Sequence, residues 1–232
     1  VGTYNGVCRF DGYRFHPYFL KSDRSDTPSS KQVSSLLADD AGRVWIGMND
    51  GLYLFEPESE SLIPYTLSEQ AGSLLHYRIT ALAQTTDGMI WVGTTRGLNR
   101  LNPRTGQLKL FRNRKAASAV ISANHVTAIC QDPSGTLWIG TVYGLNRYNK
   151  KEQRFRCFFH LGNDIGSLGS SLIHALASDR KGDVWVGTQN GVCRWDKEKE
   201  MFIRYLFNSG NDGRSLNDTV WTIQSDSRGR LW

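Results

Sequence analysis

The stretch "MIWVGTTRGLNRL" runs from Met89 to Leu101 and decides the fold class. Two apolar runs flank a G-T-T-R-G core. A glycine-bracketed turn after a strand occurs in phosphate-binding loops, but such a loop opens a helix and is followed by G-K-[ST]. The residues after Gly97 are typical of a strand, so the pattern favours the tight turn of a β-hairpin, with both glycines serving the turn.

The same string recurs along the whole chain. It appears as "VWIGMNDGLYLF" (44–55), "LWIGTVYGLNRY" (137–148) and "VWVGTQNGVCRW" (184–195). The chain begins with "VGTYNGVCRF" (1–10), which is the later part of the string. It ends with "GRLW" (229–232), which contains the start of the string. A fixed period of 46 or 47 residues between the tryptophans indicates a propeller, solenoid or array. These tryptophans are Trp45, Trp91, Trp138, Trp185 and Trp232.

Each repeat contains the signals of four short strands, for example at 126–132, 136–142, 145–149 and 154–160. Strand signals follow one another about every ten residues, without helical periodicity between them. The turn before each tryptophan has the pattern D-x-x-G, in which Asp caps the turn and Gly takes the positive φ. The residues concerned are Asp39, Asp132, Asp179 and Asp226 with Gly42, Gly88, Gly135, Gly182 and Gly229; the second repeat has Thr85 and Asp87 instead.

These observations predict an all-β protein, a β-propeller built of four-stranded antiparallel blades. Apolar residues fall on both faces of the first two strands of a repeat, as expected for sheets packed on both sides. We expect about five repeats of 46–47 residues in one propeller segment, 1–232, which forms part of a larger propeller. The expected units are approximately 1–32, 33–78, 79–125, 126–172, 173–219 and a partial unit, 220–232.

The string W-[IV]-G-T-x-x-G-[LV] after D-x-x-G resembles the two-component regulator propeller repeat, and the resemblance covers all five units. This family implies the periplasmic sensor region of a hybrid histidine kinase, anchored in the inner membrane. It further implies the remaining blades of a seven-bladed propeller, a downstream β-sandwich and a homodimer in the parent chain, and sensing of a glycan. No kinase motif is present in these residues, so the resemblance implies no catalytic activity for this segment.

Both ends of the chain fall inside the second strand of a repeat, which favours a segment cut from a longer array. A second interpretation stays open. Joining Trp232 to Val1 regenerates "GRLWVGTYNGV", so a closed ring of five blades could complete its split blade with strands from both ends.

Composition excludes several function classes. The chain is 39% hydrophobic and 22% charged with a net charge of +6, and its basic residues are scattered, with "RNRK" (112–115) as the densest run. We therefore expect no nucleic acid partner. Four cysteines without C-x-x-C spacing and five histidines without metal-ligand spacing predict neither a metal site nor a cofactor. No apolar stretch is long enough to span a membrane, and no signal peptide is present.

Two repeated residue sets are expected to be structural. The tryptophans pack between blades, although a stacking role for sugars or bases is the alternative. The aspartates cap turns; as paired carboxylates for acid–base chemistry they would stand too far apart. The residues assigned structural roles are Trp45, Trp91, Trp138, Trp185 and Trp232 together with Gly47, Gly93, Gly140 and Gly187.

Candidate ligand-binding residues lie where the repeats differ, because variable loops on a rigid scaffold carry binding. Trp221 is a further candidate, since it stands where other repeats have Ser34, Thr80, Thr127 and His174. The turns between second and third strands contribute Tyr4, Asn5, Asn49, Asp50, Thr95, Arg96, Val142, Tyr143, Gln189 and Asn190. The loops before first strands contribute Lys31, Gln32, Tyr77, Arg78, Asn124, His125, Asp218 and Thr219.

The mixture of aromatic and polar side chains suits an oligosaccharide. The leading hypothesis is therefore an extracytoplasmic sensor that binds a glycan. A protein-interaction propeller without a small ligand is the alternative. A propeller lyase or hydrolase is a third reading, although the sequence offers no convergent carboxylates or histidine pair for it.

Overall fold

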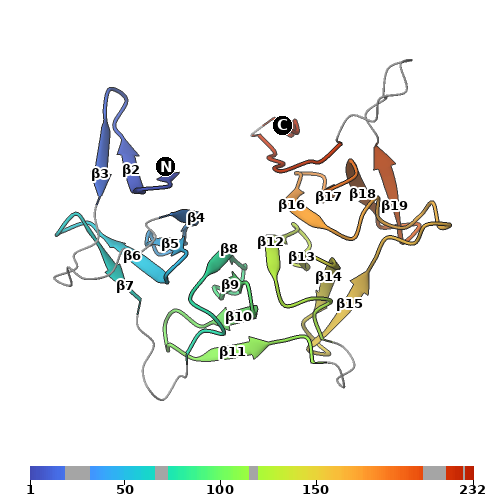
Figure 1. Ribbon diagram of the computed structural model, residues 1–232, viewed down its shortest axis with the longest axis horizontal. Helices are drawn as coiled ribbons and strands as arrows, with labels where there is room; N and C mark the ends of the chain where they lie inside the picture. The colour runs from blue at the N-terminus through green and yellow to red at the C-terminus, as the bar shows by residue number, and fades with distance from the viewer. Residues whose placement is uncertain (19–31, 66–72, 115–119, 206–217, 227) are drawn as a thin grey trace. The chain divides into compact units, whose positions relative to one another are not determined.

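The computed structural model describes residues 1–18, 32–65, 73–114, 120–205, 218–226 and 228–232. Their regular secondary structure consists of β-strands (Figure 1), so the prediction of an all-β fold is confirmed. Within these ranges, no helix has the length and hydropathy needed to cross a bilayer. The chain forms two compact units, Val1–Leu110 and Phe111–Trp232, which are described separately.

The first unit contains three antiparallel sheets, in which strands pair in chain order. The first has three strands: β1 (Gly2–Thr3), β2 (Gly6–Phe10) and β3 (Phe15–Tyr18). The second consists of β4 (Val33–Ala38), β5 (Val44–Met48), β6 (Leu52–Glu56) and β7 (Ser61–Pro64). The third consists of β8 (Ile79–Gln84), β9 (Ile90–Thr94), β10 (Gly97–Leu101) and β11 (Leu108–Phe111), which ends one residue past the unit boundary.

The second unit repeats this pattern twice. One sheet consists of β12 (Val126–Gln131), β13 (Leu137–Thr141), β14 (Gly144–Asn149) and β15 (Arg154–Phe158). The next consists of β16 (Ile173–Ser178), β17 (Val184–Thr188), β18 (Val192–Asp196) and β19 (Met201–Tyr205). An isolated antiparallel bridge joins Ser225 to Leu231. The predicted strands of the 126–160 repeat agree with the observed ones to within two residues at each end.

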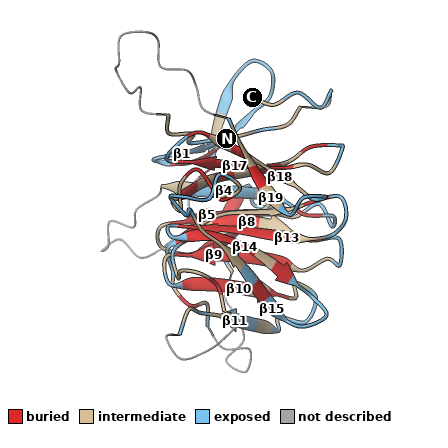
Figure 2. Cartoon of the chain, turned by 90° about the vertical axis from the view of Figure 1, so that its right-hand side faces the viewer, coloured by how far each residue is buried: buried red, intermediate tan, exposed pale blue. Residues whose placement is uncertain are grey.

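The middle strands form the core of each repeat, and Figure 2 shows buried strands between exposed turns. Both faces of β9 and β13 are buried, as predicted for sheets covered on two sides. Trp45 is fully buried and packs in a cluster with Ile79 and Leu82 of the following sheet. Trp138 lies 5.6 Å from the Trp195 ring of the following sheet, measured between ring centroids. Trp232, by contrast, is 71% exposed, since only the Ser225–Leu231 bridge follows β19 among the described residues.

The two glycines of the repeated string have different roles, which corrects the expectation that both serve the turn. A Cβ atom added to Gly47 would lie 2.5 Å from the Ile79 Cγ2 atom of the following sheet, and one on Gly140 would lie 2.7 Å from Ile173 Cγ2. The first glycine therefore permits close approach of neighbouring sheets. The second serves the turn: Gly97 has φ 144° and Gly144 has φ 107°.

The first strand of each four-stranded sheet carries an irregularity in register at the same place. In β4 it falls between Val33 and Ser35, and in β16 between Ile173 and Ala175. A bulge leaves its extra residue unpaired and re-aims its side chain. The bulged residues are Ser34, Thr80, Thr127 and His174, the position that Trp221 occupies in the last repeat.

Candidate ligand-binding loops

A threonine holds the turn between second and third strands. Thr94 Oγ1 donates to the carbonyl oxygen of Gly97 (2.8 Å) and accepts from the Arg96 N–H (3.1 Å). The two residues between Thr94 and Gly97 are therefore presented at the tip whatever their identity. Equivalent hydroxyl bonds to glycine carbonyls are made by Thr3 (2.9 Å), Thr141 (2.9 Å) and Thr188 (3.0 Å).

A side chain of the third strand anchors the loop that enters each repeat. Asn99 accepts a hydrogen bond from the Leu75 N–H at 2.9 Å and donates to the Val92 carbonyl at 2.9 Å. In the next two repeats Asn146 accepts from the Ser122 N–H (2.7 Å), and Cys193 Sγ accepts from the Gly169 N–H (3.2 Å). Sequence reasoning missed this role. The available signal was a buried asparagine in the "LNR" strand.

Four predicted site residues of the first unit meet around a histidine that was not predicted. Thr95 Oγ1 lies 2.9 Å from His76 Nδ1, and the Thr95 N–H donates to the Arg78 carbonyl at 3.3 Å. The Arg78 N–H donates to the same His76 Nδ1 at 3.2 Å. His76 also stacks on Tyr77, with centroids 4.1 Å apart and planes inclined by 27°. We call His76, Tyr77, Arg78, Thr95 and Arg96 the Tyr77 cluster.

Burial and two arginines set the charge state of His76 in the Tyr77 cluster. Burial, and then the positive charges of Arg96 and Arg78, lower the pKa of His76 below its ordinary value. The ring is therefore neutral at pH 7. Since Nδ1 accepts from the Arg78 N–H, the proton of the neutral ring lies on Nε2. Tyr77 is 63% exposed, and Arg96 is exposed at the turn tip.

The second unit has an aromatic pair at the bulge position. The exposed Trp221 ring lies 4.4 Å from the His174 ring, and burial lowers the pKa of His174. Beside the pair, Thr219 Oγ1 donates to the Gln189 carbonyl at 3.2 Å, and the Gly191 N–H donates to the Asp218 carbonyl at 2.8 Å. We call His174, Gln189, Thr219 and Trp221 the Trp221 cluster.

Other predicted residues of the second unit serve the loops or lie apart from this cluster. Tyr143 is 61% exposed with its ring 5.4 Å from Phe159, and the exposed Val142 donates its N–H to the His125 carbonyl. Asn124 accepts from the Asn113 N–H at 2.7 Å and so stabilises the loop. Asn190 Nδ2 donates to the Gly169 carbonyl at 3.4 Å.

In the first unit, Asn49 donates to Gln32 at 2.7 Å, which joins a turn to the loop before β4. Asp50 accepts from the hydroxyl of Tyr53; burial, followed by the charge of Asp50, raises the pKa of Tyr53 to about 12. Tyr4, 78% exposed, and Asn5 lie on the turn after β1. Lys31 lies outside the described residues.

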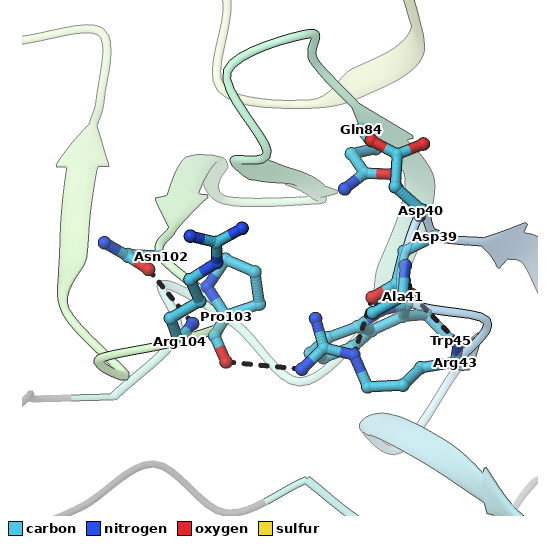
Figure 3. Close-up of polar contacts among 9 residues, drawn as sticks. All are labelled: Asp39, Asp40, Ala41, Arg43, Trp45, Gln84, Asn102, Pro103 and Arg104. Atoms are coloured by element: carbon cyan, nitrogen blue, oxygen red, sulfur yellow. Dashed lines mark hydrogen bonds and ion pairs between the residues drawn. The ribbon is translucent and has the colours of Figure 1, made fainter.

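The repeated aspartates are engaged in their own turns. Asp39 accepts hydrogen bonds from the Arg43 N–H (2.9 Å), the Arg43 guanidinium (2.7 Å) and the Trp45 indole N–H (2.8 Å), as Figure 3 shows. Burial opposes the charge of Asp39, but these hydrogen bonds outweigh it and lower its pKa. Asp132, Asp179 and Asp226 bind Trp138, Trp185 and Trp232 in the same way. Across the described residues, no group of three or more His, Cys, Asp or Glu side chains could hold a metal ion.

A groove of about 650 Å³ lies at the opposite ends of the strands in the second unit. The β12–β13, β16–β17 and β18–β19 turns line it together with residues of β14 and β18. Its basic residues are Arg147, Lys181, Arg194 and Lys197, which lie among acidic residues. The two tryptophans that line the groove, Trp138 and Trp195, are at most 5% exposed, so neither presents an open ring face. The groove thus differs from the candidate loops, where aromatic rings are exposed.

The repeated four-stranded antiparallel sheets, with glycine-mediated contact between consecutive sheets, define a β-propeller assembled from blade repeats. The sequence model of the family described as two component regulator propeller matches residues 27–50, 73–96, 121–143 and 167–190. These four stretches of the chain are two-component regulator propeller repeats.

Solved structures place the repeats among sensor regions. The chain is 25% identical to the extracellular domain of BT4673, described as a hybrid two-component system of B. thetaiotaomicron, with a TM-score of 0.71. The match covers 100% of this chain but 29% of BT4673. The extracellular domain of BT3049 of the same organism is 21% identical (TM-score 0.58), with 100% of this chain and 36% of that chain covered.

Virginiamycin B lyase from Staphylococcus aureus shares the fold alone, at 12% identity and a TM-score of 0.69, over 99% of this chain and 70% of the lyase. No curated protein matches the chain. The repeats are therefore similar to propeller domains in the extracellular regions of hybrid two-component systems.

Proposed function

We propose that this chain is the ligand-sensing propeller segment of a hybrid two-component sensor, lies in the periplasm, and binds a glycan through the Tyr77 and Trp221 clusters. The propeller repeats and the likeness to extracellular domains of two-component systems support the sensor role. Because the chain spans 29% of BT4673, the kinase, the inner-membrane anchor and the homodimer of the parent protein are parts of the same proposal.

The observation that carries the glycan proposal is the presence of exposed aromatic rings on loops already ordered by hydrogen bonds. Tyr77 is 63% exposed and Trp221 is 72% exposed, and each contacts a neutral histidine. Aromatic rings bury the apolar faces of sugars, and adjacent polar groups bind hydroxyls. Rings that are already fixed in place lose little entropy on binding.

Signalling would follow from a difference in affinity between two states of the parent protein. A ligand shifts an equilibrium only by as much as it binds one state more tightly than the other. Binding at the loops would therefore favour the state of the dimer that is read by the downstream kinase.

The test is calorimetric titration of the full-length protein with a panel of neutral and acidic oligosaccharides. We expect Tyr77→Ala or Trp221→Ala to weaken binding of the recognised glycan about tenfold or more, since base- or sugar-type stacking on an aromatic ring contributes roughly 1–3 kcal/mol. Tyr13→Ala is the matched control, because Tyr13 is 93% exposed on the β2–β3 turn. Absence of binding by every glycan would refute the proposal.

A protein partner without a small ligand is the second candidate. The exposed rings of Phe10 and Phe15, 4.9 Å apart beside Tyr13, favour it. In that case Tyr13→Ala, rather than Tyr77→Ala, would change the kinase output of the full-length protein.

A further inference from the structure

Two arginines of the Tyr77 cluster are brought together by backbone hydrogen bonds and not by carboxylates. Arg78 precedes β8, and Arg96 lies on the β9–β10 turn. The Thr95 N–H bonds to the Arg78 carbonyl, and Thr95 Oγ1 bonds to His76, so the loop and the turn are joined directly. Both arginines act on the same imidazole ring.

Neither arginine is neutralised nearby. In the described part of the first unit, Arg43 pairs with Asp39 at 2.7 Å and Arg100 pairs with Asp87 at 3.2 Å. Arg78 and Arg96 make no ion pair with a described Asp or Glu, and both are exposed. Two exposed guanidinium groups on hydrogen-bonded neighbouring segments, without a carboxylate partner among the described residues, can bind an external anion together.

The exposed Tyr77 ring directly precedes Arg78 in the chain and stacks on His76, the ring on which both arginines act. Its stacking on His76 fixes the ring, so a sugar can pack on Tyr77 while its substituent reaches Arg78 or Arg96. Guanidinium groups bind carboxylate and sulfate oxygens with two parallel hydrogen bonds, which ordinary hydroxyls cannot match. The Trp221 cluster, made of His174, Gln189, Thr219 and Trp221, contains no arginine.

We propose that the Tyr77 cluster binds an acidic saccharide, in which a carboxylate or sulfate group on the sugar contacts Arg78 and Arg96 while the ring packs on Tyr77. This inference rests on the proposed glycan-binding function. It adds the charge of the ligand and the residues that select for it.

The experiment compares matched probes by calorimetric titration of the full-length protein at physiological salt. One pair is an oligogalacturonate and its methyl ester; the other is a heparin tetrasaccharide and its desulfated form. A charged hydrogen-bonded contact predicts at least roughly tenfold tighter binding of the acidic member of one pair. The pair with the larger difference identifies the group, carboxylate or sulfate.

Arg78→Gln and Arg96→Gln should abolish this preference, so that the acidic member binds no more tightly than the neutral member of its pair. Arg104→Gln is the control, since Arg104 is exposed on the β10–β11 turn of the same unit. Equal binding of both members, or an equal loss in Arg104→Gln, overturns the inference and leaves the proposed function standing. If no member of either pair and no other glycan binds, both fail.

Discussion

At the residue scale, Asp39 explains why an aspartate stands six residues before a tryptophan in the repeat. One carboxylate oxygen accepts the Ala41 and Arg43 N–H groups, and the other accepts the guanidinium of Arg43 and the indole of Trp45. The side chain thus closes the turn and fixes a buried ring at once. Asp87 in the second repeat bonds instead to Thr85 and Arg100.

Substitution Asp39→Asn should lower stability at pH 7 by about 1–3 kcal/mol, since it weakens hydrogen bonds to a buried carboxylate. The pKa of Asp39 lies below its ordinary value of 3.8 in the folded state. Its contribution is therefore fully present above pH 3.8 and is lost as pH falls through the folded value. Asp39→Asn should lose less stability than the parent chain between pH 7 and pH 3, as measured by urea unfolding.

The matched control is Asp40→Asn, because Asp40 is exposed at the adjacent position. We expect Asp40→Asn to follow the parent chain at both pH values. Equal acid sensitivity of Asp39→Asn and the parent chain would contradict the assigned role.

At the element scale, the loop entering each repeat is held by the third strand of that repeat. Leu75 binds Asn99, Ser122 binds Asn146 and Gly169 binds Cys193. The loop after Leu75 carries His76, Tyr77 and Arg78, so Asn99 positions the Tyr77 cluster without touching a ligand.

Asn99→Leu should therefore destabilise the protein by about 1–3 kcal/mol, because it leaves the buried Leu75 N–H without its acceptor. It should also weaken glycan binding at Tyr77. Asn99→Cys should recover part of both losses, since a cysteine accepts the equivalent bond at Cys193. Urea unfolding and calorimetric titration measure the two effects. An Asn99→Leu variant with unchanged stability and affinity would show that the loop holds its conformation independently.

At the scale of the whole molecule, the reactivity of the cysteines measures whether the second unit is folded. All four are free, and three lie in that unit. Burial, then the charge of Asp132, raises the pKa of Cys130 to about 11, and burial raises the pKa of Cys157 and Cys193. These groups favour the folded state less as pH rises above the ordinary value of 9.0.

Alkylation by iodoacetamide at pH 8 should be roughly 100-fold slower at Cys130 in the folded chain than in urea, since the thiolate is the nucleophile and the pKa is two units higher. Peptide mapping by mass spectrometry measures each cysteine separately. Equal rates at Cys130 in the folded and unfolded chain would show that the second unit opens readily.

Local signals in the sequence predicted the strands and turns well. Short strand-like runs, D-x-x-G and G-T-x-x-G depend on neighbours a few residues apart, so the strands of the 126–160 repeat fall where expected. The roles of Gly47 and Asn99 depend on partners 32 and 24 residues away, Ile79 and Leu75, and no local pattern marks them. His76 was missed because its neighbours Thr95 and Arg96 are distant in the chain.

The threonine-to-glycine bond places different requirements on different positions of a turn. It occurs in four of the five described turns between second and third strands, where it encloses Tyr4-Asn5, Thr95-Arg96, Val142-Tyr143 and Gln189-Asn190, and the hydroxyl–carbonyl distance stays between 2.8 and 3.0 Å. The turn at Asn49-Asp50 has Met48 in place of the threonine. Selection for folding therefore acts on the flanking Thr and Gly, while selection for recognition acts on the enclosed pair. New ligand specificity can therefore evolve at the enclosed positions while the threonine and the glycine keep the turn closed.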